Sequence, residues 1–298
     1  MKIINYSEIT PENIYKNRRL FIKKLGFGAS SFAISTFPFL NNAKANNRDE
    51  LTSYKDITTY NNYYEFGTSK GDPHRNSKNF KTQPWNISIE GEVDKPMNLS
   101  MEEISETFLS EERVYRLRCV EGWSMVIPWM GFSLSKLLSK VYPTSKAKFI
   151  EFESIYDPDQ MKGQRYPVLN WPYKEGLRID EAMHPLTTVV TGLYGKKLPN
   201  QNGAPLRIFI PWKYGFKSAK AIVKIKFVKK MPNTAWMNAS PREYGFYSNV
   251  NPNVNHPRWS QSTERPINGD IFAPRIKTLM FNGYGDEVAY LYSGMDLK

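Results

Sequence analysis

Cys119 is the only cysteine in this 298-residue chain, and its thiol is the side chain with the widest chemical possibilities. A single thiol excludes an intrachain disulfide, an iron–sulfur cluster and a cysteine-rich zinc site, because each of these needs several sulfurs. The adjacent Arg118 is expected to lower the pKa of the thiol and to favour the thiolate, which is the form that binds soft metals. A lone cysteine is, however, more often a small buried apolar side chain. Both interpretations stay open on these residues alone.

The segment around this cysteine has a specific pattern. It reads Arg118-Cys119-Val120-Glu121-Gly122-Trp123, and Pro128-Trp129 and Gly131 follow it. This pattern resembles the cysteine loop of the sulfite oxidase fold of molybdenum enzymes. Within that fold, the chain resembles the family of catalytic subunits of bacterial protein-methionine-sulfoxide reductases. Supporting segments occur in order along the chain, at residues 60–66, 156–158, 202–207, 211–217 and 251–259.

The resemblance implies a molybdenum cofactor. A pterin dithiolene would hold the metal, with Cys119 as the third sulfur, and each chain would bind one Mo-molybdopterin without a dinucleotide extension. Ser154 stands where the family commonly has threonine, and Ser218 and Ala219 differ from the commoner pair. The family's pterin-contacting positions fall on Asn61, Tyr64, Glu65, Ser154, Asn202, Arg207, Ser218, Ala219 and Lys220.

The residue types at these positions agree with the binding of an anionic group. Gly203 and Gly215 allow the backbone to approach a ligand closely. Arg207 and Lys220 can pair with a phosphate, arginine as a bidentate fork and lysine as a point charge. Without the resemblance, residues 203–220 would more often be interpreted as turns at strand ends, with the cationic side chains exposed to solvent.

The resemblance also implies the reaction, in which a sulfoxide loses its oxygen as water with two electrons and two protons. We expect Glu121 and Tyr247 (or Tyr244) to flank the substrate oxygen as proton donor or hydrogen-bond partner. Arg258 would stabilise developing charge, and Asn62 would face the metal. Aromatic side chains near Trp236 and Tyr247 are expected to hold a methionine side chain through sulfur–aromatic contacts.

Electrons must come from another protein, because the sequence contains no haem-attachment motif and no flavin glycine fingerprint. The resemblance implies a haem-containing integral membrane subunit or a flavin reductase as donor, and oxidised periplasmic proteins as substrates.

The first alternative function is that of a sulfite oxidase or a small-molecule S- or N-oxide reductase on the same fold. Sulfite would need several arginines around the metal, and only Arg258 and Arg118 are obvious. An alternative from another class is an exported binding protein without a cofactor.

The pattern of elements predicts an α+β fold, a single mixed and β-rich domain of the sulfite oxidase type over residues 85–298. Alternating apolar residues predict strands at 85–93, 113–117 and 148–152, and a later strand pair at 205–211 and 221–228. A capping-box pattern at residues 100–103 and apolar residues at helical spacing over 133–141 predict two helices. The strands lack regular alternation with helices, which disfavours a doubly wound fold.

The first 45 residues are predicted to be a removable export signal. Arg18-Arg19 precedes a mildly apolar stretch, and Ala43-Lys44-Ala45 offers a small-x-small cleavage site. The pattern resembles a twin-arginine signal and therefore predicts a periplasmic protein that is exported folded.

Removing residues 1–45 lowers the net charge from +12 to +7. The remaining chain has no run of basic residues, which disfavours a nucleic-acid partner. Residues 46–84 are predicted to form an extended N-terminal arm.

Overall fold

The computed structural model describes residues 50–268 and 274–297, so the predicted signal segment lies outside the described residues. The strands are β1 (Asn86–Gly91), β2 (Met97–Ser100), β3 (Glu111–Arg118), β4 (Trp123–Ser133), β5 (Phe149–Ser154), β6 (Lys174–Arg178), β7 (Thr188–Leu193), β8 (Lys196–Lys197), β9 (Arg207–Phe209), β10 (Ile222–Val228), β11 (Thr263–Pro266) and β12 (Ile276–Lys277).

The helices are short. The α-helices are α2 (Tyr54–Thr59), α3 (Asp72–Asn76), α4 (Met101–Thr107), α5 (Leu134–Leu138), α6 (Ile179–Met183), α7 (Ala235–Ala239) and α8 (Gly285–Val288). The 3₁₀ turns are η3 (Tyr64–Phe66), η4 (Ser139–Val141), η5 (Lys162–Arg165), η6 (Asn200–Asn202), η7 (Gly215–Lys217), η8 (Met280–Gly283) and η9 (Ala289–Tyr292). No helix within residues 50–268 and 274–297 is long and apolar enough to cross a membrane.

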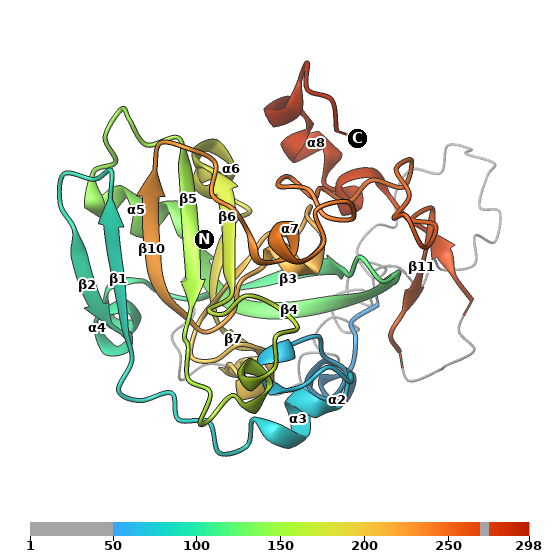
Figure 1. The fold of residues 1–298 in the computed structure, drawn as a ribbon, viewed down its shortest axis with the longest axis horizontal. Coiled ribbons are helices and arrows are strands. Elements are labelled where there is room, and N and C mark those ends of the chain that lie inside the picture. Colours follow the sequence, from blue (N-terminus) through green and yellow to red (C-terminus); the bar gives the residue numbers. More distant parts are fainter. Residues whose placement is uncertain (1–49, 269–273, 298) are drawn as a thin grey trace, which may run out of the picture.

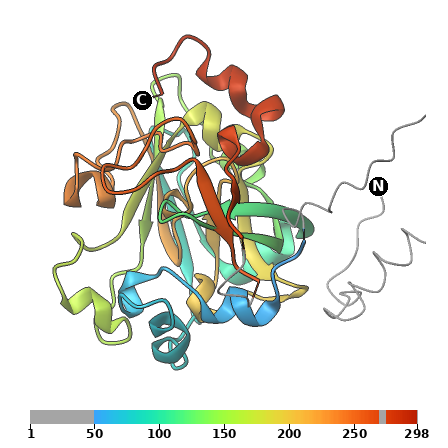
Figure 2. The ribbon, with the colours of Figure 1, turned by 90° about the vertical axis from the view of Figure 1, so that its right-hand side faces the viewer.

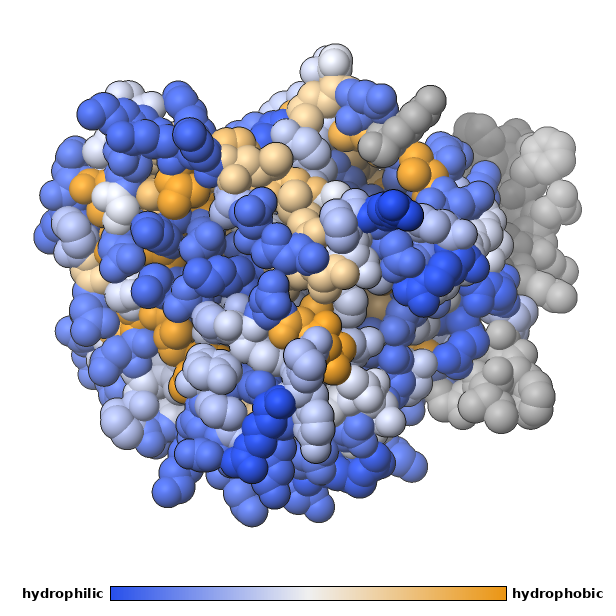
Figure 3. Space-filling view, in the orientation of Figure 1, coloured by the Kyte–Doolittle hydropathy of each residue, from blue (hydrophilic) through white to orange (hydrophobic). Residues whose placement is uncertain are grey.

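Two mixed sheets form the body of the molecule (Figure 1). The five-stranded sheet has the order β2-β1-β10-β5-β6. The second sheet follows the path β12-β11-β4-β7-β8, with β3 paired to β4 and β9 paired to β7. Because parallel and antiparallel pairs occur together and the helices are not regular crossovers, the predicted α+β class is confirmed. Figure 3 shows that one face of the molecule is mostly hydrophilic, with apolar side chains in small separate groups.

Most local predictions are confirmed. Ser100 caps α4 by accepting from the Glu103 amide, and the Glu103 carboxylate accepts from the Ser100 amide in return. The predicted helix at 133–141 is α5 followed by η4. In β10, Ile225 and Phe227 are buried and Lys226 is exposed, as the alternation predicts. A bulge near the start of β10 shifts the pattern there.

The predicted pairing of residues 205–211 with 221–228 is wrong. β9 pairs with β7, and β10 pairs with β1 and β5, so the two segments belong to different sheets. They touch only at their ends, through a backbone hydrogen bond from Ile222 to Leu206 at 3.4 Å, next to a bridge between Arg207 and Lys220. The chain between them, residues 210–221, passes from one sheet to the other, which a sequence pattern of two neighbouring strands does not reveal.

The prediction of an extended arm at residues 46–84 is also wrong for the part that the structure describes. Residues 50–84 contain α2, η3 and α3 and cover the lower side of the molecule in Figures 1 and 2 (blue to cyan). The Ser53 hydroxyl accepts from the amide of Asp56 and donates to its carboxylate, which starts α2. This serine–aspartate spacing is a helix-start signal that the polar composition of the segment concealed.

Two buried ion pairs fix the segment that connects the sheets. Lys213 lies 2.6 Å from Glu181 of α6, and Lys217 lies 2.5 Å from Glu175 of β6, with all four side chains fully buried. Burial of a charge is favourable only when a partner of opposite charge is close. The two pairs therefore bind residues 211–217 to the rest of the molecule.

Replacing Glu175 by Gln should destabilise the protein by about 3–5 kcal/mol, because it leaves the Lys217 ammonium buried without its carboxylate. The matched control is Glu153→Gln, whose salt bridge to Lys174 is partly exposed and worth about 0–1 kcal/mol. Denaturant unfolding of both variants measures the difference. Equal losses in the two variants would contradict the structural role of the Lys217–Glu175 pair.

Candidate active site

A cavity of about 460 Å³ lies between the 50–84 segment, the loop after β3 and the chain that leads into β10. Its size is within the range of sites for small molecules and cofactors. Residues from five regions line it: Ile57, Tyr60–Glu65, Leu117, Cys119–Glu121, Trp123, Met125, Ile127, Trp129, Leu169, Tyr173, Gln201, Asn202, Arg207, Gly215, Phe216, Ser218–Lys220, Trp236, Tyr244, Arg258 and Trp259.

A tight hairpin positions Cys119 in the wall of this cavity. β3 and β4 pair antiparallel up to Arg118 and Ser124, and the Cys119 amide donates to the Trp123 carbonyl at 2.9 Å. Gly122 has a φ of +83°, a conformation that glycine adopts without strain and that closes short hairpins. The predicted location of the cysteine, where a strand runs into a glycine-containing loop, is confirmed.

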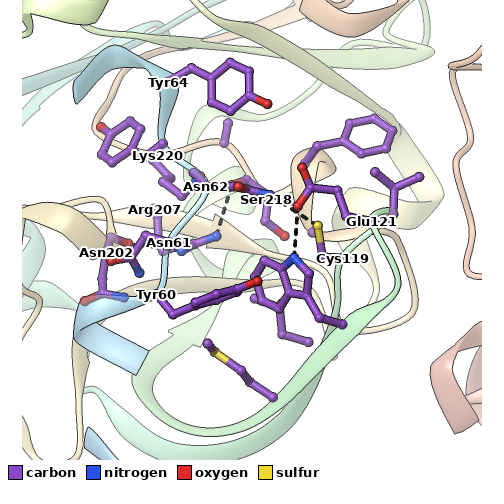
Figure 4. A pocket seen from close by; sticks show the side chains of 18 of the residues that line it. Tyr60, Asn61, Asn62, Tyr64, Cys119, Glu121, Asn202, Arg207, Ser218 and Lys220 are labelled. Atoms are coloured by element: carbon purple, nitrogen blue, oxygen red, sulfur yellow. Dashed lines mark hydrogen bonds between the residues drawn. The ribbon is translucent and has the colours of Figure 1, made fainter. Parts of the chain in front are cut away.

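The sulfur of Cys119 is part of a hydrogen-bonded group (Figure 4). The side-chain nitrogen of Asn62, Nδ2, lies 3.3 Å from Sγ and 3.1 Å from Oε2 of Glu121. The same Oε2 accepts from the indole nitrogen of Trp123 at 3.0 Å. Lys70 forms an ion pair with Glu121 at 2.9 Å. Burial raises the pKa of Glu121, but the donors Lys70, Trp123 and Asn62 outweigh it and hold that pKa below its ordinary value.

Arg118 acts on the thiol only weakly, because its side chain is engaged elsewhere. Its fully buried guanidinium points away from the cavity, pairs with Glu264 at 3.1 Å and donates to Gln261 Oε1 at 2.8 Å and to the Cys119 carbonyl. Burial first, and the Glu121 charge second, raise the pKa of Cys119 to about 12, although Arg118 lowers it in part. Arg118 therefore lowers the thiol pKa, as expected, but burial and the Glu121 charge outweigh it. A bound metal cation would deprotonate a coordinating thiol directly.

Eight of the nine positions predicted to contact a pterin line the cavity, and Ser154 does not. Ser154 is the last residue of β5, opposite Ile222 in β10. Its hydroxyl is buried and has no hydrogen-bond partner in the described part of the chain. The eight positions that line the cavity are Asn61, Tyr64, Glu65, Asn202, Arg207, Ser218, Ala219 and Lys220.

Two of these positions are cations, the buried Arg207 and the half-buried Lys220. Arg207 donates to the carbonyls of Asn202 and Ser218 at 3.0 and 3.2 Å, and Lys220 donates to the carbonyl of Asn62 at 2.6 Å. Within residues 50–268 and 274–297, neither has a carboxylate within ion-pair distance. Burial lowers the pKa of Arg207 to about 10, and burial and Arg207 together lower the pKa of Lys220. An anionic group in the cavity would compensate both charges.

Unpaired polar atoms show that the cavity suits a polar ligand. The side-chain oxygens of Asn61, Asn62 and Asn202 are buried and accept no hydrogen bond from any residue that the structure describes. Buried polar atoms are rarely left unpaired in folded proteins. Acceptors beside two cations fit a molybdenum–pterin group, which carries ring nitrogen donors and a phosphate. Among the described residues, no cluster of three or more His, Cys, Asp or Glu side chains could hold a metal ion.

Aromatic side chains form the outer part of the cavity. The ring of Trp236 lies 5.5 Å from that of Tyr64 and 5.0 Å from that of Tyr244, and Phe216 lies 5.2 Å from Tyr244. Trp236 lines the cavity. Tyr247 does not line the cavity. Its ring packs near Tyr292 and Arg178 instead.

Arg258 lies in the cavity wall and is largely exposed. Its guanidinium pairs with Glu243 at 2.9 Å and lies over the ring of Trp259, 4.8 Å from the centroid. The ring of His256 stacks on that of Trp259, with the two ring centroids 3.7 Å apart. The carboxylate and the indole therefore restrict where the Arg258 charge can be placed.

Sequence reasoning missed several residues of this site. Lys70 and Glu243 gave no signal, because each is a single charge in a polar stretch. Trp123 lies within the cysteine motif, but the motif alone does not reveal that its indole donates to the Glu121 carboxylate and holds it in place. Trp129 also belongs to the motif and forms the inner wall under Arg207, whose guanidinium carbon lies 5.2 Å from the centroid of its ring.

The chain is similar to known proteins over nearly its whole length. The family model of the oxidoreductase molybdopterin binding domain matches residues 74–236. The protein-methionine-sulfoxide reductase catalytic subunit of Xanthomonas axonopodis pv. citri is 55% identical, covering 98% of this chain and 96% of that protein. The corresponding subunit of Burkholderia mallei is 54% identical over 98% and 94%. The solved sulfane dehydrogenase of Paracoccus pantotrophus has a TM-score of 0.45 and 14% identity, covering 80% of this chain and 66% of that chain.

Proposed function

Since the chain belongs to the molybdopterin-binding oxidoreductases, in the family of protein-methionine-sulfoxide reductase catalytic subunits, we propose that it reduces methionine sulfoxide residues in proteins. The observation that carries the proposal is the meeting of one thiol and two cations in one cavity, at Cys119, Arg207 and Lys220. A sulfur ligand and a phosphate site are the two protein features that a molybdenum–pterin group requires.

The cofactor that we propose is one Mo-molybdopterin per chain, without a dinucleotide extension. Cys119 would supply the protein's sulfur ligand to the metal. Arg207 and Lys220 would pair with the phosphate, and Asn61 and Asn202 would accept hydrogen bonds from the pterin. When bound, this group supplies the two-electron oxygen-atom transfer on which sulfoxide reduction depends.

The side chains around the sulfur orient one another. Glu121 accepts from Asn62 and Trp123 and is paired with Lys70, so its carboxylate is held by three donors. With its pKa below the ordinary value, Glu121 is a poor proton donor at neutral pH. We assign it the role of hydrogen-bond acceptor that orients Asn62, and we withdraw the expectation that it donates a proton.

Tyr244 is the better candidate for the proton. It lines the cavity, and burial raises the pKa of its phenol to about 12, so the hydroxyl keeps its proton at neutral pH. Arg258, held by Glu243, would stabilise negative charge on the departing oxygen. The rings of Tyr64 and Trp236 would contact the methionine sulfur and its methyl group.

Replacing Tyr244 by Phe should lower kcat for a peptide methionine sulfoxide by roughly 100-fold or more, the effect expected when a general acid is lost. Tyr247→Phe is the matched control and should change kcat by less than about twofold, because this ring lies outside the cavity. Steady-state assays with a reduced viologen as electron donor measure both. Equal losses in the two variants would remove Tyr244 from the proton-donor role.

Sulfite oxidation is the alternative within the same family, and the arginines of the site disfavour it. Arg118 is turned toward Glu264 and away from the cavity, and Arg207 lies at the position proposed for the phosphate. Arg258 is then the arginine left to receive a sulfite anion. The alternative of a cofactor-free binding protein predicts purified protein without molybdenum and without pterin absorbance.

One experiment separates these functions. Purified protein is analysed for molybdenum and pterin, and its activity is measured with oxidised peptide, with free methionine sulfoxide and with sulfite. We expect one metal per chain and reduction of the peptide sulfoxide with the highest kcat/KM. Sulfite oxidation in the absence of peptide reduction would overturn the proposal.

We further propose that the protein acts in the periplasm, after export in the folded state by the twin-arginine route. The paired Arg18-Arg19 and the cleavage pattern at Ala43–Ala45 support this proposal. The electron donor that we propose is a haem-containing integral membrane subunit, and the substrates are oxidised periplasmic proteins. Replacing both arginines by lysine should retain the protein in the cytoplasm, as measured by cell fractionation.

A further inference from the structure

Lys70 lies beside the group of side chains that surrounds the sulfur, in the 50–84 segment that also carries Asn62. Its ammonium nitrogen lies 2.9 Å from Oε2 of Glu121 and donates to Oε1 at 3.2 Å. The carbonyl of Lys70 accepts from the amide of Asn61, so the turn that carries Lys70 is joined to the chain next to Asn62. Lys70 itself does not contact Cys119 or line the cavity.

The ammonium of Lys70 completes the hydrogen bonding of the Glu121 carboxylate. Asn62 and Trp123 both donate to Oε2, and the structure places Lys70 as the donor to Oε1. Without Lys70, Oε1 would lose this donor, and the carboxylate could rotate about its last side-chain torsion, which has only weak intrinsic preferences. The orientation of Glu121 therefore depends on Lys70.

The orientation of Glu121 in turn decides what Asn62 does. An asparagine amide has two N–H groups in one plane. Nδ2 of Asn62 is within bonding distance of both Glu121 Oε2 and Cys119 Sγ, at 3.1 and 3.3 Å. If the carboxylate rotates, the amide plane follows it, and the donor to the sulfur moves. Hydrogen bonds to a ligating sulfur change how much electron density it gives to a metal.

We propose that Lys70 is a positioning residue that sets the electronic properties of the Cys119 sulfur through Glu121 and Asn62, without touching the sulfur. This inference deepens the proposed function, since it assumes that a metal binds Cys119. A role in stability alone is a poor explanation, because the side chains of Lys70 and Glu121 are 27% and 31% exposed. Ion pairs exposed to this extent contribute about 0–1 kcal/mol.

The test compares Lys70→Met, which keeps the length and removes the charge, with Lys70→Arg, which restores a donor. Lys55→Met is the matched control, because Lys55 is exposed on α2 in the same segment. Metal-loaded proteins are examined by the sulfur-to-metal absorption band, by the paramagnetic resonance spectrum of the one-electron-reduced metal and by redox titration. Turnover of a peptide methionine sulfoxide and thermal unfolding are measured on the same samples.

We expect Lys70→Met to shift the absorption band, the resonance spectrum and the midpoint potential, and to lower kcat about 10-fold with KM and the unfolding temperature unchanged. Lys70→Arg should return the spectra and kcat to within about twofold of the parent protein. Spectra and kcat of Lys70→Met identical to those of Lys55→Met would overturn the inference. A spectral shift in a protein that reduces no sulfoxide would instead contradict the proposed function and leave the role of Lys70 standing.

Discussion

Cys119→Ser is expected to abolish sulfoxide reduction, with kcat lowered well beyond the roughly 10–100-fold that loss of a hydrogen bond to a metal ligand causes. A serine hydroxyl is a hard oxygen donor that remains protonated at neutral pH, whereas a soft thiolate suits a metal already bound by sulfur. The substitution changes one atom in a buried position with 6% exposure, so the fold should be retained. Steady-state assays and metal analysis measure the effect.

The pterin content of the same variant separates loss of a ligand from loss of the whole site. Arg207, Lys220 and the asparagines are unchanged in Cys119→Ser, so pterin should remain bound while the part of the absorption that comes from the Cys119 sulfur disappears. Full turnover with unaltered molybdenum content would contradict the assignment of Cys119 as ligand. Complete loss of pterin would show that the cysteine contributes to cofactor retention rather than to the reaction alone.

Lys220→Met should weaken retention of the cofactor by about 10–100-fold, since hydrogen bonds to charged groups contribute about 1.5–3 kcal/mol. The same variant in its cofactor-free form should unfold at an equal or higher temperature than the parent. Burial and the neighbouring Arg207 charge lower the pKa of this half-buried ammonium, which has no carboxylate within ion-pair distance in the described chain, so an apolar side chain removes an unfavourably placed charge. Dialysis followed by pterin analysis, together with thermal unfolding of the cofactor-free protein, measures both effects.

The matched control for this prediction is Lys226→Met, which replaces an exposed lysine on β10. It should leave cofactor retention unchanged. Weaker retention in both variants would point to the overall positive charge instead of the Lys220 cation in the cavity. Retained cofactor in Lys220→Met would mean that Arg207 alone holds the anion.

Local sequence signals determined a large part of the structure. The capping box at Ser100, the hairpin glycine at Gly122 and the alternation in β10 involve hydrogen bonds or side-chain directions within a few residues. The same is true of the position of Cys119 at the end of β3. Such interactions form whatever the distant chain does, so a pattern of residue types is enough to predict them.

The family resemblance added the residues of the cavity. Eight of the nine predicted pterin contacts lie together there, although residues 61 and 220 are far apart in the sequence. Ser154 lies just outside, and the departure from the family's threonine at that position gave no indication of this. The orientation of individual side chains is set by packing, which the matched motifs do not specify.

The sequence by itself determined that Cys119 lies at the end of a strand and that Gly122 allows the chain to turn after it. It also determined that the cationic Arg207 and Lys220 occur later in the chain. Only the tertiary structure decided that Arg118 faces Glu264, that Tyr244 and not Tyr247 reaches the cavity, and that Lys70 holds Glu121. The physical reason is sequence separation: Arg118 and Glu264 are 146 residues apart, and Lys70 and Glu121 are 51 apart. Contacts of this kind exist only after both sheets have assembled.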